Sequence, residues 1–337
     1  MCTLIVLIKN MELRCTCGRD CIKPASEVLK DLKDFYNPCD NCKEYKLKKF
    51  TPLTQQINLR RLNDDFGRCV CRKRHLDLVM AHILQIMIDE GFKDKKSTLR
   101  DVCVPLITPA YPLNSVPYLQ EDSLVILSGD VSKNCAQRIV KEVSEVKGVL
   151  KGYLKDTVGI KDFESVANTY DVLAGCDLRC DIVNTPWGNL CIYKHQGQIH
   201  IELPKPLSPK IKYLKKVLDN YNKPKIVDCT CGPGTLGIAA LKAGASKVVF
   251  NDIWYPACQT TAMNLEINGF PVELRGNKKG LIADGDNFKV YCMDIQYLKT
   301  VLDEKFEVCL VDVFPGVDST EFVNSIRNIC REVVLID

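Results

Sequence analysis

The sequence predicts an α/β protein with an open parallel sheet at its C-terminus, preceded by an α+β region and an N-terminal cysteine-rich module. Three observations support this prediction. From residue 225 onward, short apolar runs alternate with helical stretches of 8–14 residues. A glycine-containing turn follows the first of these runs. Seven cysteines lie between residues 15 and 71.

The chain has 337 residues, enough for two domains or more. Apolar residues make up 46% and charged residues 26%, which is typical of a protein with a buried core and excludes wholesale disorder. Shifts in composition predict a cysteine-rich module with a helix over residues 1–100. An α+β substrate-recognition region is expected over 101–204, and the sheet domain over 205–337.

No apolar run reaches the roughly 18 residues that a membrane span requires. Residues 1–8 are apolar but lack the flanking signals of a secretory leader, so they predict a first strand. We therefore expect a cytoplasmic protein that makes no membrane contact. In a reducing compartment the 19 cysteines are expected to be metal ligands or buried thiols rather than a disulfide framework.

Elements before the sheet follow from periodicity and turn residues. Apolar residues at helical spacing predict a helix over residues 74–91, with Gly91 at its C-terminal end. Four prolines within 103–118 indicate an irregular connection. A strand over 123–127, a helix over 132–147, a hairpin of 189–193 with 198–203 and a helix over 210–218 come next.

The C-terminal third is the most regular part. The pattern predicts strands over 225–230, 247–252, 288–294, 306–312 and 332–337. It predicts helices over 236–243, 255–268, 295–303 and 321–330. This alternation is typical of a parallel sheet with helices on both faces.

The cysteines of the N-terminal module have the spacing of metal ligands. Two thiolates in a C-x-x-C pair can bind one tetrahedral ion. Eight candidates are enough for two four-coordinate sites, or for one site with spare thiols: Cys15, Cys17, Cys21, Cys39, Cys42, Cys69, Cys71 and His75. Zinc is the first choice because histidine can join cysteine in its sites, and an iron–sulfur cluster is the second. The metal is expected to be structural.

Residues 43–74 carry ten Lys or Arg against three Asp or Glu, although the whole chain has a net charge of only +4. A basic segment of this kind suits contact with phosphates. It is equally compatible with a solvated surface around a small metal module.

The glycine turn connects a predicted strand to a predicted helix. Gly232 and Gly234 lack a Cβ and so permit close approach of a ligand to the backbone. The following strands end in Asp252, Asp294 and Asp312. Carboxyl ends of parallel strands line the crevice where open α/β sheets bind ligands, although each acid could instead cap the helix that follows it.

Residues 205–337 resemble the class I S-adenosylmethionine-dependent methyltransferases, which have a Rossmann-like sheet. Asp228-x3-Gly232-x-Gly234 occupies the first motif of that family, and Cys231 lies within it. The resemblance implies S-adenosylmethionine as cofactor, bound by the residues at the family's motif positions. These are Asp228, Cys231, Gly232 and Gly234, the ribose acid Asp252 with Ile253, and the adenine-side acid Asp294.

Within that family, the first motif and residues 251–269 are similar to RNA methyltransferases, in particular to tRNA guanine-N2 and guanine-N1 enzymes. Residues 312–316 lie where the dimethylguanosine enzymes carry D-P-F-G. The resemblance therefore implies catalytic roles for Asp312, Phe314 and Pro315. Asp312 would hold the amino nucleophile or accept its proton, and Phe314 would stack on the substrate ring.

Two departures from the family leave alternatives open. The sequence of residues 312–316 is neither N-P-P-Y nor D-P-F-G, which leaves the substrate type open. The chain also stops after its fifth expected strand, where the family has two more. The sheet is then truncated, completed by upstream residues such as 189–203, or covered at its edge by a second subunit in a homodimer.

The leading interpretation is a methyltransferase acting on a nucleobase in structured RNA, with tRNA as the expected partner. A methyltransferase acting on a small molecule, such as an intermediate of cofactor biosynthesis, is the first alternative. A non-catalytic binding module that has retained the fold is the second, because fold does not determine function.

Overall fold

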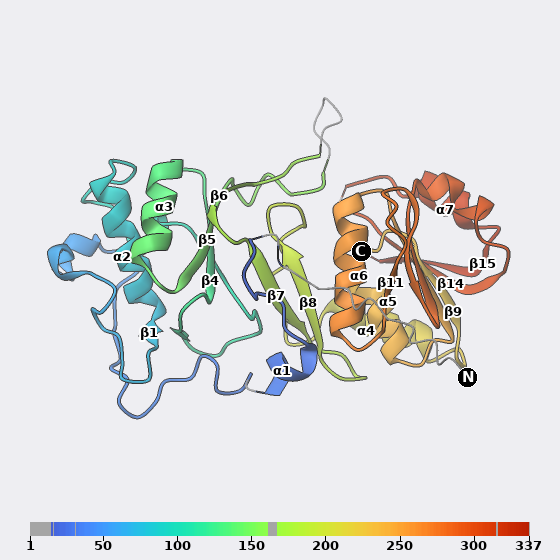
Figure 1. Ribbon diagram of the computed structural model, residues 1–337, viewed down its shortest axis with the longest axis horizontal. Helices are drawn as coiled ribbons and strands as arrows, with labels where there is room; N and C mark the ends of the chain where they lie inside the picture. The colour runs from blue at the N-terminus through green and yellow to red at the C-terminus, as the bar shows by residue number, and fades with distance from the viewer. Residues whose placement is uncertain (1–14, 16, 31, 161–166, 315, 337) are drawn as a thin grey trace, which may run out of the picture. The chain divides into compact units, whose positions relative to one another are not determined.

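The computed structural model describes residues 15, 17–30, 32–160, 167–314 and 316–336. The chain divides into two compact units (Figure 1). The C-terminal unit comprises residues 1–24 and 216–337, and the central unit comprises residues 25–215. The strand expected over residues 1–8 lies outside the described residues. Among the described residues, no helix is long and apolar enough to cross a membrane.

The C-terminal unit is built on a seven-stranded sheet with the order β11-β12-β13-β10-β9-β14-β15. Strands β13, β10, β9, β14 and β15 run parallel, and β11 and β12 form an antiparallel hairpin that pairs with β13. The bounds are β9 Lys225–Asp228, β10 Lys247–Asp252, β11 Glu273–Leu274, β12 Gly280–Gly285, β13 Phe288–Cys292, β14 Phe306–Asp312 and β15 Cys330–Ile336.

Helices cover both faces of this sheet, as the alternating pattern predicts. On one face, helix α5 brings Gly237 against the ring of Phe250, where a Cβ would lie 2.2 Å from a ring carbon. On the other face, η4 and α7 pack over Val227, Val249 and Cys309. Figure 1 shows α6 and α7 on opposite sides of the strands. The bounds are α5 Thr235–Lys242, α6 Tyr255–Ile267, η4 Ile295–Thr300 and α7 Thr320–Ile326, with α4 Pro209–Leu218 preceding β9.

The predicted α/β architecture is confirmed, and the strands over 247–252 and 306–312 have the expected bounds. Three local predictions were wrong. Residues 295–300 form a 3-10 helix rather than an α-helix. The hairpin of β11 and β12 was missed because most of its side chains are exposed or half-buried, which leaves little apolar alternation to detect. Residues 189–193 do not form a hairpin with 198–203, because residues 190–195 pair with residues 178–183 instead.

Residues 189–203 do not complete the C-terminal sheet, which was one of the alternatives left open by the sequence. Residues 190–195 form β8, which pairs along its whole length with β7 in a separate two-stranded sheet. Among the described residues, β15 is the edge strand on one side of the C-terminal sheet. The additional hairpin of β11 and β12 lies at the opposite edge, beyond β13.

The central unit contains a four-stranded sheet with the order β2-β4-β5-β6. Strands β4 and β5 are parallel and are connected through α3, whereas β2 and β6 run antiparallel to their neighbours. The bounds are β2 Val104–Ile107, β4 Leu124–Ser128, α3 Lys133–Glu142, β5 Val146–Lys151, β6 Asp171–Gly175, β7 Leu178–Val183 and β8 Leu190–His195. The helix expected over 132–147 ends earlier because β5 begins at Val146.

Helix α2 (Leu76–Asp89) forms the centre of the core of the central unit. Its Val79, Ile83 and Met87 are fully buried in a cluster that also contains residues of α3, β4 and β5. Gly91 has a φ of +77° just beyond the helix, as the predicted C-terminal glycine requires. The remaining short elements are α1 Ala25–Lys30, η1 Leu53–Gln55, η2 Leu59–Arg61, β1 Arg74–His75, η3 Leu99–Asp101 and β3 Tyr118–Leu119.

Candidate functional site

The glycine turn joins β9 to α5 at the carboxyl edge of the C-terminal sheet. Gly232 and Gly234 have φ values of +51° and +84°, which L-residues with side chains rarely adopt. The fully buried Asp228 ends β9, and its Oδ2 accepts a hydrogen bond from the Gly237 N–H at 2.9 Å. The carboxylate thereby holds the first turn of α5 against the strand.

Neighbouring elements fix the backbone of this turn. The Cys231 N–H donates to the Asn251 carbonyl at 2.8 Å, which ties the turn to β10. From α6, the Thr261 hydroxyl donates to the Gly232 carbonyl and the Asn264 amide to the Pro233 carbonyl, both at 2.9 Å. The turn is therefore preorganised by side chains of a separate helix.

The two glycines differ in their surroundings. A Cβ on Gly232 would have no heavy atom within 4 Å, so open space adjoins this residue. A Cβ on Gly234 would lie 2.9 Å from Cγ2 of Thr261. Gly232 therefore leaves room for a ligand at the backbone, whereas Gly234 allows the turn to pack closely on α6.

Asp252 ends β10 directly beside the turn. Its Oδ2 accepts from the Gly232 N–H at 2.9 Å and its Oδ1 from the Trp254 N–H at 2.8 Å. Burial raises the pKa of this carboxyl above its ordinary value and outweighs the lowering effect of these backbone donors. The next side chain, Ile253, is 63% exposed, so an apolar surface adjoins the acid.

The two other acids at strand ends have different surroundings. Asp294 is half-buried, and its Oδ1 accepts from the Gln296 N–H at 2.9 Å, so it caps η4. Asp312 ends β14, where its N–H donates to the Thr230 hydroxyl at 2.8 Å and its carbonyl accepts from that hydroxyl at 2.9 Å. Phe314 is half-buried, and Pro315 lies outside the described residues.

The sequence predicts no role for Asn251, and the structure places it among three strand ends. Its side-chain amide donates to the carbonyls of Cys229 and Met293, each at 3.1 Å. Thr261 and Asn264, with Asn268, form a buried polar series along α6. This spacing of three and four residues was the available signal that one face of the helix serves the turn. Cys231 is buried against it, with its Sγ 3.5 Å from the Thr261 hydroxyl.

The central unit brings four of the predicted metal ligands together. The sulfurs of Cys39, Cys42, Cys69 and Cys71 all lie within 4.8 Å of one another. Cys39 and Cys42 lie in one tight turn, in which the Cys42 N–H donates to the Cys39 carbonyl. Cys69 and Cys71 lie in another, in which the Arg72 N–H donates to the Cys69 carbonyl. Four sulfurs at this separation could hold one tetrahedral metal ion.

His75 lies outside this group of four sulfurs. Its Nδ1 accepts from the Asp77 N–H at 3.2 Å, so the imidazole caps the N-terminus of α2. Its ring packs edge-on against Tyr118, with ring centroids 5.1 Å apart. These contacts give the ring a structural position at the start of the helix.

The other predicted ligands lie in the N-terminal segment of the C-terminal unit. The Cys17 sulfur is 3.4 Å from that of Cys15 and 3.5 Å from that of Cys21. Three thiols are thus grouped within seven residues, in accord with their spacing in the sequence.

Two arginines of the basic segment form ion pairs with a carboxylate in the protein interior. Arg74 is fully buried, and its guanidinium binds the buried Glu145 at 2.6 Å. Arg68 contacts the same carboxylate at 2.9 Å and Asp64 at 2.7 Å. Seven other basic side chains of the segment are exposed: Lys43, Lys46, Lys48, Lys49, Arg60, Arg61 and Arg72. The segment is therefore partly a folding element and partly a charged surface.

The matching family model covers the turn and its partners. The model for ribosomal protein L11 methyltransferase (PrmA) matches residues 210–291, which include the glycine turn, Asp252 and helix α6. The C-terminal unit carries a class I S-adenosylmethionine-dependent methyltransferase domain. The resemblance seen in the first motif is thereby confirmed at the level of the domain.

Curated relatives are similar to the methyltransferase domain and to part of the region before it. The chain is 29% identical over 155 residues to ribosomal RNA large subunit methyltransferase I of Photobacterium profundum, covering 46% of this chain and 34% of the relative. It is 40% identical over 70 residues to ribosomal protein L11 methyltransferase of Shewanella piezotolerans, covering 19% and 24%. The chain thus spans about a third or less of the length of these relatives.

Solved structures show a weaker likeness. The structure of Methanocaldococcus jannaschii Trm5 in complex with adenosine has a TM-score of 0.38 and 15% identity, covering 73% of this chain and 60% of that chain. A putative transferase from Pyrococcus horikoshii has a TM-score of 0.44 and 16% identity, covering 76% and 78%.

The unequal space around the two glycines of the methyltransferase domain predicts unequal effects of substitution. We expect Gly234→Ala to lower the melting temperature, because the new Cβ meets Thr261 and the residue is held at positive φ. The destabilisation should be about 1–3 kcal/mol. Gly232→Ala should cost about 1–2 kcal/mol from its backbone conformation alone, and it should weaken cofactor binding at least as strongly.

Thermal unfolding and titration calorimetry with S-adenosylmethionine would separate the two variants. Thr261→Ala combined with Gly234→Ala should recover part of the lost stability. Equal melting temperatures for Gly234→Ala and the wild type would contradict the packing role assigned to Gly234.

Proposed function

We propose that the methyltransferase domain binds S-adenosylmethionine at the carboxyl edge of its sheet and that the chain methylates a nucleobase in structured RNA. The open space beside Gly232, next to the carboxylate of Asp252, is the observation that carries the cofactor assignment. A backbone without a Cβ at Gly232 and a half-buried carboxylate beside it fit a ligand that presents a ribose diol.

The same edge supplies the other residues proposed to hold the cofactor. Asp252 would accept hydrogen bonds from the ribose hydroxyls, and Ile253 would cover one side of the adenine. Asp294 would accept from the adenine amino group. Asp228 and Cys231 would act by holding the turn, because the buried Asp228 is bonded to α5 and the buried Cys231 contacts Thr261 of α6.

When bound, S-adenosylmethionine supplies a methyl group already activated by its sulfonium. The protein therefore needs mainly to position a nucleophile in line with that methyl. Asp312 would hold an amino group of the substrate and accept its proton as the new N–C bond forms. Phe314 would stack on the substrate ring, with Pro315 shaping the same loop.

The choice of RNA rests on the exposed basic residues of the central unit. Lys43 and Arg72 directly follow the clustered Cys42 and Cys71, so two charges adjoin the proposed metal site. A basic surface with a rigid support suits a polyanion. Among structured RNAs we propose tRNA, because residues 251–269 are similar to tRNA guanine methyltransferases.

The proposed metal is a structural zinc ion at Cys39, Cys42, Cys69 and Cys71. Four thiolates satisfy a tetrahedral ion completely and leave no position for a substrate. The site would join the loop around Cys39 to the turn around Cys69, two segments with few large apolar side chains. An iron–sulfur cluster has a similar ligand set and remains the alternative.

The test is transfer of labelled methyl from S-adenosylmethionine into unmodified total RNA, ribosomal protein and a small-molecule extract, run in parallel. Label in RNA, lost with Asp312→Ala, is the expected result. The control is Asp284→Ala, which removes an acid from the β12 hairpin at the other edge of the sheet. Label in the small-molecule fraction alone would overturn the RNA assignment.

Methylation of a ribosomal protein is a second candidate, because the matching family model is that of a ribosomal protein methyltransferase. It predicts label in the protein fraction and none in RNA. Absence of label from all three fractions, together with no binding of S-adenosylmethionine, would instead support a non-catalytic binding module.

A further inference from the structure

Phe50 of the central unit is a large apolar side chain in an exposed loop. Its side chain is 76% exposed, although water is an unfavourable environment for a phenyl ring. The guanidinium carbon of Arg100 lies 4.7 Å from the ring centroid, a cation–π contact that steadies the ring. Most of the ring surface remains accessible to a binding partner.

Two basic segments that are distant in the sequence lie side by side, and Phe50 belongs to one of them. The Leu53 N–H donates to the Ser97 carbonyl at 3.2 Å, and the Thr54 hydroxyl donates to the Lys95 carbonyl at 2.9 Å. These bonds bring the loop of residues 93–100 beside the loop of residues 46–56. The exposed basic side chains of the two loops are Lys46, Lys48, Lys49, Lys95, Lys96 and Arg100.

The acids among these residues are held locally. Asp94 accepts from the Lys96 N–H at 2.7 Å, and Asp101 accepts from the Thr98 N–H and hydroxyl, both at 2.8 Å. Glu44 is the third acid, and it lies 3.4 Å from the ammonium of Lys46. Across residues 44–56 and 93–101, seven Lys or Arg therefore stand against three Asp or Glu.

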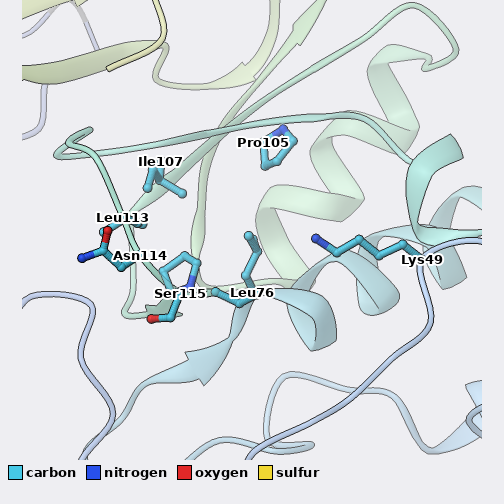
Figure 2. Close-up of a pocket in the computed structure, with 9 residues that line it drawn as sticks. Lys49, Leu76, Pro105, Ile107, Leu113, Asn114 and Ser115 are labelled. Atoms are coloured by element: carbon cyan, nitrogen blue, oxygen red, sulfur yellow. The ribbon is translucent and has the colours of Figure 1, made fainter. Parts of the chain in front are cut away.

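A shallow pocket adjoins the same loop at Lys49. Its volume is about 480 Å³, within the range of small-ligand pockets. Leu76, Pro105 and Ile107 form apolar walls, and Asn114 and Ser115 supply polar groups at the rim. Figure 2 shows the side chain of Lys49 reaching into this space from the side opposite Asn114 and Ser115. Apolar walls with a polar rim and one cation match the chemistry of a nucleobase and its phosphate.

We propose that this surface binds a single-stranded segment of RNA, with one base stacked on Phe50, an adjacent base in the pocket beside Lys49, and phosphates on the surrounding lysines. Unpaired bases expose the faces that stack on aromatic rings, whereas a duplex hides them. The inference rests on the proposed function, because it supplies a surface that holds the RNA substrate.

The experiment measures binding of the full metal-loaded chain to a fluorescent 12-nucleotide single-stranded RNA, by anisotropy and without S-adenosylmethionine. Removing one stacking contact should weaken binding by roughly 5- to 150-fold. We therefore expect such a loss for Phe50→Ala and near-normal binding for Phe50→Trp. Phe92→Ala, which alters another exposed phenylalanine of the central unit, is the matched control and should leave affinity unchanged.

Salt dependence separates stacking from charge. Each phosphate contact to a single strand contributes about 0.7 to the slope of log affinity against log salt. Lys48→Gln should lower that slope by about 0.7, whereas Phe50→Ala should lower affinity and leave the slope unchanged. Photocrosslinking with 4-thiouridine RNA should label peptides that contain residues 46–50 and 113–117.

Unchanged affinity of Phe50→Ala, at an unchanged melting temperature, would overturn the proposal. So would an equal affinity for duplex and single-stranded RNA of the same length. The outcome is independent of catalysis: loss of RNA binding in Phe50→Ala, with no methyl transfer by the wild type, would retain this surface and reject the proposed function. If Phe50→Ala transfers methyl groups to RNA as fast as the wild type, the proposed function is retained and this surface is rejected.

Discussion

Replacing Asp252 by alanine is expected to weaken S-adenosylmethionine binding by roughly 30- to 150-fold, about 2–3 kcal/mol. Hydrogen bonds to a charged acceptor are worth about 1.5–3 kcal/mol each, and this variant removes the acceptor proposed for the ribose diol. It also removes the bond that holds the Gly232 N–H at 2.9 Å, so the turn loses part of its preorganisation. Titration calorimetry of the purified chain would measure the change.

Asp252→Asn refines this prediction because it retains the size of the side chain and removes its charge. Burial raises the pKa of Asp252, so in the wild type the carboxylate becomes protonated at a higher pH than an exposed aspartate. Cofactor affinity of the wild type should therefore fall as the pH is lowered toward that raised pKa. In Asp252→Asn this part of the pH dependence should disappear.

Asp284→Ala is the matched control for both variants. Asp284 forms an ion pair with Arg275 in the β12 hairpin. It lies opposite the start of β13, at the amino ends of the parallel strands and away from the carboxyl edge. It should bind S-adenosylmethionine as the wild type does. Equal affinity of Asp252→Ala and Asp284→Ala would reject the proposed cofactor site.

Replacing Cys39 by serine is expected to remove one metal ion per chain and to lower the melting temperature of the central unit by about 10 °C or more. Zinc sites in small domains contribute about 10–16 kcal/mol of apparent binding free energy, and even a third of this has a large effect. A loss of about 4 kcal/mol corresponds to roughly 8–16 °C for a unit of this size. Elemental analysis and calorimetry provide the two readouts.

Cys103→Ser is the control for the metal site, because Cys103 is a free thiol that belongs to neither group of clustered cysteines. It should retain the full metal content. Iron and visible absorption in the purified chain would select the iron–sulfur alternative. A Cys39→Ser variant with unchanged metal content and unchanged melting temperature would refute a metal at these four sulfurs.

The order of elements in the C-terminal unit could be predicted from local sequence. Strands β10 and β14 each contain a run of buried apolar residues and end in an aspartate, so their bounds were visible. The β12 strand is largely half-buried and gave no such signal. Hydrophobic periodicity reports burial, so a strand whose side chains are mostly exposed or half-buried gives little signal.

The proposed cofactor residues were found from the sequence for a related reason. Parallel strands direct their carboxyl ends to one edge, so acids that end successive strands must lie near each other. The support of the turn by Thr261 and Asn264 was not predicted. The spacing of polar residues along α6 marks one face of the helix, but it does not say that this face packs against a turn about 30 residues earlier.

The sequence by itself determined the alternating architecture, the glycine turn and the ligand-like spacing of the cysteines, because each is a property of neighbouring residues. Only the tertiary structure decided which groups meet. It pairs Cys39 and Cys42 with Cys69 and Cys71, uses His75 to cap a helix, and buries Arg74 against Glu145. It also brings Arg100 over Phe50. Apart from the His75 cap, these contacts close loops of about 30 to 70 residues, and only the packing of the whole unit selects among side chains of the same type.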